Sequence, residues 1–64
     1  MTKNELQSLH IGDKVYMTIP DIQTAFMVTL VGTVIRINFN GSQVLVKWKT
    51  GSEIWHGRTS IEKI

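Results

Sequence analysis

The dipeptide Asn40-Gly41 constrains the fold more than any other feature of the sequence, because it separates two runs of β-branched and apolar residues. A type I′ turn needs positive φ at both central residues, and Asn-Gly tolerates that conformation best. We therefore expect residues 27–49 to form an antiparallel hairpin. The pairs that a two-residue turn would place on its core face are Ile37 with Val44, Ile35 with Val46, and Thr33 with Trp48.

Further strand signals precede this hairpin. Val15, Met17 and Ile19 alternate with more polar residues, which is the period-two pattern of a strand with one solvated face. Residues 20 to about 25 are then expected to leave the sheet as a loop, because proline cannot donate to a ladder. Gly32, in the middle of the next β-branched run, predicts a β-bulge or a sharp bend.

A second turn is expected at Thr50-Gly51, followed by a short strand over residues 53–56 and a closing segment over residues 60–64. If this turn also contains two residues, Val46 pairs with Trp55. The two turns together then predict a core made of Ile35, Ile37, Val44, Val46, Trp48 and Trp55.

Residues 2–9 predict a short helix or helical turn. Thr2 or Asn4 can cap its free N–H groups, and Leu6 and Leu9 share one face at i, i+3 spacing. We therefore expect residues 1–10 to form a helical turn that packs on a mostly β domain of five short strands, residues 11–64.

The size and composition of the chain limit its class. It has 64 residues, 42% apolar and 19% charged, so we expect a single globule with a thin core. The absence of cysteine excludes a disulfide framework and a thiolate zinc site. The N-terminal residues lack the apolar stretch of a signal peptide, and no segment approaches the roughly 20 apolar residues of a membrane span. A cytoplasmic protein is therefore expected.

Several short motifs occur in a suggestive order: Gly12-Asp13-Lys14-Val15, Gly32-Thr33-Val34, Val44-Leu45-Val46-Lys47-Trp48, Gly51, and Ile61-Glu62-Lys63-Ile64. This order resembles that of the SH3-like barrels of the Tudor and KOW type, over residues 11–64. The resemblance implies a small five-stranded SH3-like barrel with a binding role, but it does not imply a particular ligand.

The first and last of these motifs are also similar to those of the plasmid-encoded type II dihydrofolate reductases, whose barrel opens on Gly-Asp-basic-Val and closes on Leu-Glu-Arg-Ile. In that family a Gln-Ile-Tyr segment just before the ending lines a pore shared by four chains. Here the corresponding segment is Ile54-Trp55-His56. The glutamine and tyrosine that would bind cofactor and substrate are absent, so the resemblance does not imply that activity.

Catalytic and metal-binding patterns are not found in the sequence. His10 and His56 are the two histidines, and their spacing from Asp13, Glu53 and Glu62 does not suggest a zinc site. The serines lie in no nucleophile motif, and the glycines are dispersed at turns rather than gathered in a phosphate-binding loop. We therefore expect a protein that is not an enzyme and has neither metal nor cofactor.

The face opposite the predicted core mixes aliphatic side chains with cations. Its members are Val34, Arg36, Leu45, Lys47, Ile54 and His56. In one interpretation Leu6 and Leu9 cover the aliphatic members. In the other, this face docks on a protein partner or on a second copy of the chain. The leading hypothesis is a non-catalytic protein-interaction or small regulatory protein, of a size that suits a phage or another mobile element.

A weak, sequence-tolerant nucleic-acid-binding protein is the alternative. Its phosphate contacts would come from Arg36, Lys47, Lys49 and Arg58, with an aromatic ring stacked on an unpaired base. The formal net charge of +2 favours contact with an anion only modestly. The two tryptophans are expected to pack in the core or at its rim.

Overall fold

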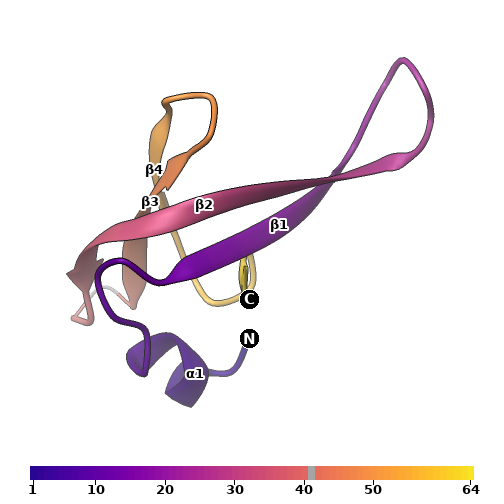
Figure 1. Cartoon of the computed structure of the whole chain (residues 1–64). Helices are drawn as coiled ribbons and strands as arrows, with labels where there is room; N and C mark the ends of the chain where they lie inside the picture. The colour runs from indigo at the N-terminus through magenta and orange to yellow at the C-terminus, as the bar shows by residue number, and fades with distance from the viewer. Residues whose placement is uncertain (41) are drawn as a thin grey trace.

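The computed structural model describes residues 1–40 and 42–64, in which one short helix precedes an antiparallel sheet of five strands (Figure 1). The elements are α1 (Lys3–Gln7), β1 (Lys14–Pro20), β2 (Met27–Asn38), β3 (Gln43–Trp48), β4 (Glu53–His56) and β5 (Glu62–Lys63). The strand order is β4-β3-β2-β1-β5. Within the described residues no pairing joins β4 to β5, so the sheet is not closed into a barrel. The predicted mostly β fold with five strands and an N-terminal helix is confirmed.

A capping box starts α1. The Glu5 backbone N–H donates to Thr2 Oγ1 at 3.2 Å, and the Thr2 backbone N–H donates to the Glu5 carboxylate at 2.9 Å. These bonds satisfy donors that the first turn of a helix leaves free. The hydrogen bond from the Thr2 backbone also stabilises the ionised carboxylate and so lowers the pKa of Glu5. The short helix is therefore stabilised by its cap and by the burial of Leu6, because a helix of five residues is not stable by itself in water.

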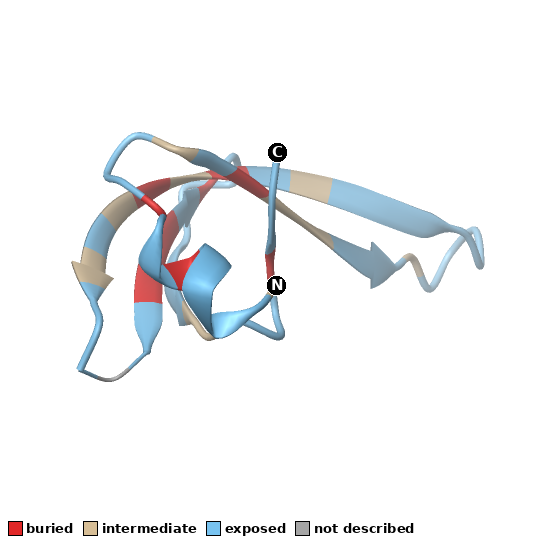
Figure 2. Ribbon diagram, turned by 90° about the horizontal axis from the view of Figure 1, so that it is seen from below, coloured by how far each residue is buried: buried red, intermediate tan, exposed pale blue. Residues whose placement is uncertain are grey.

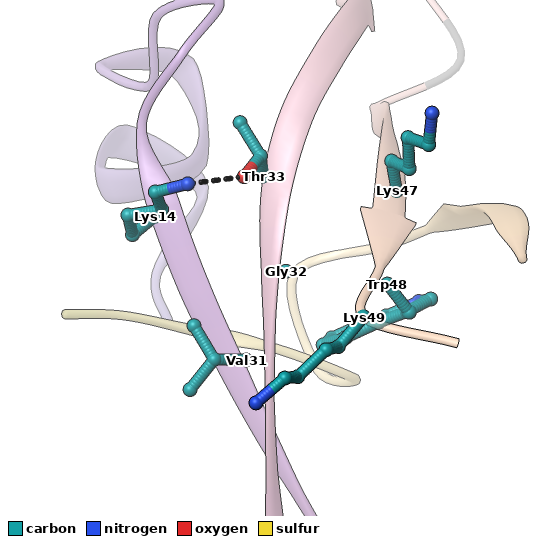
Figure 3. Close-up of a pocket in the computed structure, with 7 residues that line it drawn as sticks. All are labelled: Lys14, Val31, Gly32, Thr33, Lys47, Trp48 and Lys49. Atoms are coloured by element: carbon teal, nitrogen blue, oxygen red, sulfur yellow. Dashed lines mark hydrogen bonds between the residues drawn. The ribbon is translucent and has the colours of Figure 1, made fainter. Parts of the chain in front are cut away.

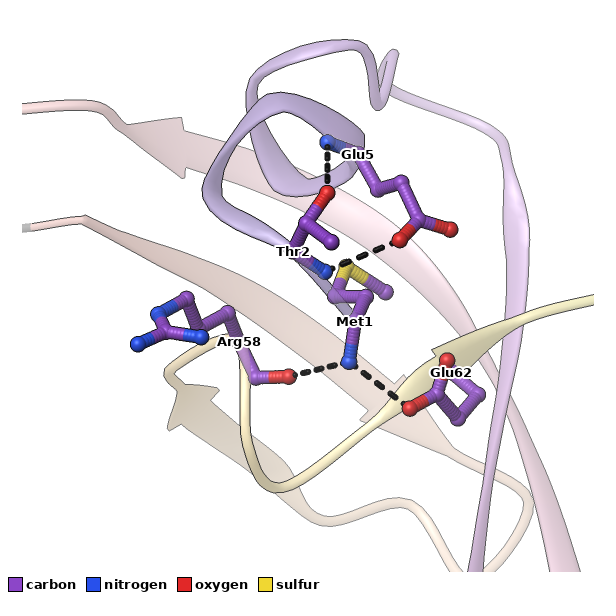
Figure 4. A network of polar contacts seen from close by, with 5 residues as sticks. All are labelled: Met1, Thr2, Glu5, Arg58 and Glu62. Atoms are coloured by element: carbon purple, nitrogen blue, oxygen red, sulfur yellow. Dashed lines mark hydrogen bonds and ion pairs between the residues drawn. The ribbon is translucent and has the colours of Figure 1, made fainter.

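The amino group of Met1 ties the start of the chain to its end (Figure 4). It lies 2.7 Å from the Glu62 carboxylate in β5 and donates to the Arg58 carbonyl at 2.8 Å. These contacts hold α1 against the segment that leads into β5.

The core lies on one face of the sheet, which we call the inner face, and α1 covers it (Figure 2). Its buried members are Leu6, Leu9, Val15, Val34, Val44, Val46, Trp48 and Ile61. Met1, Met17, Leu30 and Ile37 are partly buried against this cluster. Leu6 of α1 and Leu9, which follows the helix, thus join the same core as the strands and do not form a second core behind it.

The pairing of β2 with β3 slips by one residue at Ile35. Ile37 pairs with Val44, as predicted, but Val46 pairs with Val34 and not with Ile35. The bulge therefore lies at Ile35, whereas the sequence suggested Gly32. Because a one-residue slip exchanges the two faces of a strand, Val34 turns inward and is fully buried.

Residues 39–42 connect β2 to β3. The Ser42 N–H donates to the Phe39 carbonyl at 3.1 Å, and Asn38 pairs with Gln43. The hairpin is confirmed. The predicted type I′ turn at Asn40-Gly41 includes Gly41, which lies outside the described residues.

The β3–β4 hairpin has a three-residue loop, so the prediction of a two-residue turn is wrong. The Gly51 N–H donates to the Trp48 carbonyl, and the Trp48 N–H donates to the Ser52 carbonyl, both at 2.8 Å. Gly51 has a φ of +94°, the left-handed conformation that follows a type I turn in loops of this length.

This longer loop exchanges the faces of β4. Ile54 pairs with Val46, and Trp55 pairs with Leu45. The predicted pairing of Val46 with Trp55 is therefore wrong, and Trp55 leaves the expected core for the opposite face, where it is 42% exposed. His56 moves to the inner face, beside Trp48.

Gly32 lies where β2 and β3 pack most closely. A Cβ at this position would meet Cγ1 of Val46, would lie 2.8 Å from Cε3 of Trp48, and would lie 3.0 Å from the Lys47 carbonyl oxygen. Contacts this short leave no room for a side chain. Glycine is thus required here by packing.

The β1–β2 hairpin extends far beyond the core. We call residues 17–31 the arm, because they lie beyond the last pairing of β1 with β5 and of β2 with β3 (Figure 1). The radius of gyration is 11.9 Å, against about 10.7 Å for a compact chain of this length. The accessible surface is 4540 Å², against roughly 4,200 Å² for a compact protein of this mass. The arm therefore makes the molecule elongated.

Candidate nucleic-acid interface

The face of the sheet opposite α1, which we call the outer face, carries most of the polar and cationic strand residues. Alternation along the paired strands places on it Lys14, Tyr16, Val31, Thr33, Arg36, Leu45, Lys47, Glu53 and Trp55. The assignment of these residues to the outer face follows from the bulge at Ile35 and the three-residue loop that ends at Gly51. Without these two irregularities, Trp55 would lie on the inner face and Val34 on the outer one.

A hollow of about 430 Å³ opens where β3 ends beside β2. Its lining residues are Lys14, Val31, Gly32, Thr33, Lys47, Trp48 and Lys49. Figure 3 shows Lys14 on one side of β2 and the two other lysines on the opposite side, with the Lys49 side chain extending toward β2. The Lys14 ammonium donates to Thr33 Oγ1 at 2.6 Å. Three lysine side chains thus line one hollow, together with Val31, Gly32, Thr33 and Trp48.

Charge is unevenly distributed between this region and the rest of the molecule. The outer face and the adjoining Lys49 hold four of the seven cations and only one of the five carboxylates, Glu53, which gives +3. The other residues therefore sum to −1, since the whole chain carries +2. Within the described residues, none of these four cations forms an ion pair. Their charges are available to a ligand.

An exposed aromatic ring lies on the same face as these cations. Trp55 is 42% exposed and lies beside Leu45, which has Arg36 on its other side. Leu45, between these two neighbours, is only 9% exposed. Trp55 and the Arg36 guanidinium therefore lie on either side of the nearly buried Leu45, at the centre of the outer face.

The second tryptophan is fixed in the core. The Trp48 Nε1–H donates to His56 Nε2 at 3.1 Å, and the two rings meet edge to face at 87° with centroids 5.3 Å apart. Burial lowers the pKa of His56, and the neutral ring is the form that can accept this bond. His56 therefore acts as a partner of the core tryptophan.

The structure divides the protein-binding surface predicted from the sequence. Arg36, Leu45 and Lys47 lie on the outer face, but Leu45 is nearly covered. Val34 is buried because of the bulge, and Ile54 and His56 lie on the inner side because of the three-residue loop. The six predicted residues do not form one surface.

The predicted nucleic-acid-binding residues lie closer together. Arg36 and Lys47 share the outer face, and Lys49 lines the hollow beside Lys47. Arg58 lies apart from them, in the turn before β5, where its carbonyl accepts a hydrogen bond from the Met1 amino group. Sequence reasoning missed two contributors, Lys14 and Trp55. Lys14 could have been found from the β1 alternation, whereas Trp55 required the loop length.

Residues 1–40 and 42–64 contain neither a candidate metal site nor a candidate membrane-spanning helix. No group of three or more His, Cys, Asp or Glu side chains is gathered there in a way that could hold a metal ion. His10, the other histidine, has a largely exposed side chain 3.9 Å from the Asp13 carboxylate. No helix in this part of the chain is long and apolar enough to span a membrane.

No protein-family model, curated protein or solved structure matches the chain. The functional assignment therefore depends on the geometry and charge of the outer face.

Proposed function

We propose that the chain is a non-catalytic binding module that holds a single-stranded nucleic acid on its outer face. The observation that carries this proposal is the convergence of Lys14, Lys47 and Lys49 around one hollow, on the face that also exposes Trp55. Phosphates supply most of the affinity of such complexes, and ammonium groups without carboxylate partners suit them. An exposed tryptophan gives an unpaired base a surface to stack on.

A single strand fits this face better than a duplex. The hollow is shallow and lies on a sheet, and among the described residues no helix or long loop projects from the outer face to enter a groove. Stacking on an aromatic ring also requires an unpaired base. With about four cations and no base-reading constellation, binding should be weak, salt-dependent and tolerant of sequence.

We also propose that the sheet is an open variant of the SH3-like barrel. The first four strands form a meander, and β5 returns to the free edge of β1, which is the connectivity of a sheet that curls toward closure. Such barrels often serve as binding modules, which agrees with the proposed role.

The test is a titration of labelled oligothymidylate and of a matched duplex at several salt concentrations. For about four phosphate contacts, the logarithm of the association constant should fall with the logarithm of salt with a slope near −3. Binding of the single strand should be tighter than that of the duplex. Undetectable binding at low salt would remove the proposal.

Two variants locate the site. Lys47→Gln should weaken single-strand binding several-fold at low salt and make the slope shallower by about 0.7. Trp55→Ala should weaken it by roughly 10-fold through loss of stacking. Lys3→Gln removes the same charge from α1, away from the outer face, and should change little. If Lys3→Gln weakens binding as much as Lys47→Gln does, the attraction is a property of the net charge alone.

A further inference from the structure

The arm exposes apolar side chains on both faces of its ribbon and at its tip, beyond Met17 and Leu30, which still contact the core. Its exposed apolar residues are Ile19 (39%), Ile22 (98%), Phe26 (75%), Met27 (62%), Val28 (37%) and Val31 (43%). Asp21 is the only charged residue of the arm. A two-stranded ribbon is marginally stable in water without further packing. The arm is thus the part of the molecule that most needs a partner.

Hydrogen bonding shows which backbone groups of β2 are unpaired in the arm. The Val34 N–H donates to the Asp13 carbonyl, and the Asp21 N–H donates to the Phe26 carbonyl. Because donors and acceptors alternate along an antiparallel strand, the even-numbered residues of β2 bond to β1. The odd-numbered residues Met27, Thr29 and Val31 point their N–H and C=O groups away from β1. No described strand pairs with β2 there, since β3 ends opposite Gly32, which pairs with Trp48.

The other edge of the arm is less open. By the same alternation, Thr18 and Pro20 of β1 point outward, as the bond from the Ile64 N–H to the Lys14 carbonyl indicates. Pro20 has no N–H to donate, and β5 already covers β1 at Val15 and Tyr16. Continuous pairing is therefore available on the β2 edge and interrupted on the β1 edge.

We propose that two copies of the chain pair antiparallel along this β2 edge, about a two-fold axis at Thr29. The free stretch is bounded by the tip of the arm at one end and by β3 at the other, so residues 27–31 form its whole length. Centring them places Thr29 opposite the partner's Thr29, and Met27 opposite the partner's Val31. Each of these pairs exchanges two hydrogen bonds, and the two sheets become continuous.

The side chains suit this register. Met27, Thr29 and Val31 point to one side of the joined sheet, and Val28 and Leu30 to the other, so aliphatic residues meet aliphatic residues and threonine meets threonine. The register also brings the tip of each arm, with Asp21, toward the end of the partner's β3, where the partner's Lys49 lies. The only charge on the arm thus approaches an opposite charge.

A second copy is favoured over other occupants on three grounds. The stretch Met27–Val31 contains no charge and no proline, and natural monomers rarely leave such an edge unprotected. A fully exposed aromatic side chain offers roughly 150–250 Å², so the arm presents on the order of 500 Å² of apolar surface. Pairing along the β2 edge satisfies the backbone groups of Met27, Thr29 and Val31 and brings the flanking apolar side chains of the two arms together. The acidic residue at the tip disfavours a nucleic acid.

Proline substitutions test this edge directly. Thr18 and Thr29 are direct cross-strand partners in the arm, and neither N–H takes part in the β1–β2 ladder. Thr29→Pro removes two hydrogen bonds of the proposed dimer and should raise its dissociation constant by about 100-fold. Thr18→Pro is the matched control and should leave the dissociation constant within a few-fold. Sedimentation over a wide concentration range measures both, and near-ultraviolet circular dichroism of Trp48 verifies that the core remains folded.

Cysteine cross-linking tests the register without proline. The chain has no cysteine, and opposed residues of a hydrogen-bonded pair lie about 5.5 Å apart at Cα, within the range of a disulfide. Thr29→Cys should therefore form a covalent dimer on mild oxidation, and Thr18→Cys should form little.

Each remaining outcome is decisive. A wild-type chain that stays monomeric at high concentration overturns the dimer, as does equal cross-linking of the two cysteine variants. A monomer that cosediments with phospholipid vesicles would assign the arm to a membrane surface instead. The dimer is measured without nucleic acid, so its failure can be distinguished from failure of the proposed function, although the register brings the partner's Asp21 toward Lys49 of the hollow.

Discussion

The two halves of the β1–β2 hairpin are made by the same two strands and have the same pairing, yet only one half is packed. At the base, Val15 and Val34 are fully buried. In the arm, Ile19 and Val28 pair with each other and remain more than one-third exposed. The difference is the layer on the inner face, since α1 and Ile61 cover the base and do not extend to the arm. Strand pairing alone therefore does not create a core. The core extends only as far along the hairpin as α1 and Ile61 cover it.

The largest expected difference between the two halves is in the free energy of unfolding lost when a large aliphatic side chain is removed. Leu6→Ala removes a fully buried residue from the covering helix and should cost about 3 kcal/mol of unfolding free energy. Ile22→Ala removes a side chain that is 98% exposed and should change it by less than about 0.5 kcal/mol. Urea denaturation followed by tryptophan fluorescence measures both. Similar losses in the two variants would mean that the arm packs on the monomer.

A smaller effect should come from adding a methyl group where β2 and β3 pack closely. Gly32→Ala places a Cβ against Val46, Trp48 and the Lys47 carbonyl, and should cost about 2 kcal/mol. Gly57→Ala is the control, because its Cβ would have only one neighbour, at 3.9 Å. The comparison fails if Gly32→Ala is as stable as Gly57→Ala in the same denaturation experiment.

The capping box should contribute less again. Thr2→Ala removes the acceptor for the Glu5 N–H and should cost about 1 kcal/mol, since α1 is only one layer of the base. Thr18→Ala, in the arm, should be close to neutral. Thermal unfolding by circular dichroism can rank the two, and an equal loss in both would show that the cap does not hold α1 in place.

The smallest expected effect is a pH dependence of the stability, which should come from His56 in β4. The folded pKa of His56 lies below its ordinary value of 6.5, so the unfolded chain binds more protons in the interval between the two. Stability should therefore be complete above pH 6.5 and fall as the pH decreases through that interval. His56→Gln, which can still accept from Trp48, should remove this dependence, and His10→Gln should preserve it. An unchanged pH profile in His56→Gln would exclude His56 as its source.

The sequence predicted the class of fold because its signals are local. Asn40-Gly41 marked the β2–β3 hairpin, and Thr2 with Leu6 and Leu9 marked a helix that buries leucines. The face assignments failed at two single-residue irregularities. A bulge can occur at several positions of a uniformly β-branched strand, and Thr50-Gly51 is compatible with either a two-residue or a three-residue loop.

The candidate site, like the fold, could be predicted only in part from the sequence. Arg36, Lys47 and Lys49 were recognised because cations on neighbouring strands can be read from alternation. Trp55 was not recognised, since its face depends on the loop that ends at Gly51. The arm could not be anticipated either, because Ile19 and Val28 have the pattern of buried residues, and the alternation does not record how far α1 reaches.

Pro20 limits how many copies of the chain can join by pairing of strand edges. In a dimer joined along β2, the outermost strand of each arm is β1, whose remaining backbone edge is interrupted by a residue with no N–H. A third copy would find no continuous ladder there, so growth stops at two. An apolar arm with two open edges could polymerise into fibres, whereas one with a single open edge closes on itself.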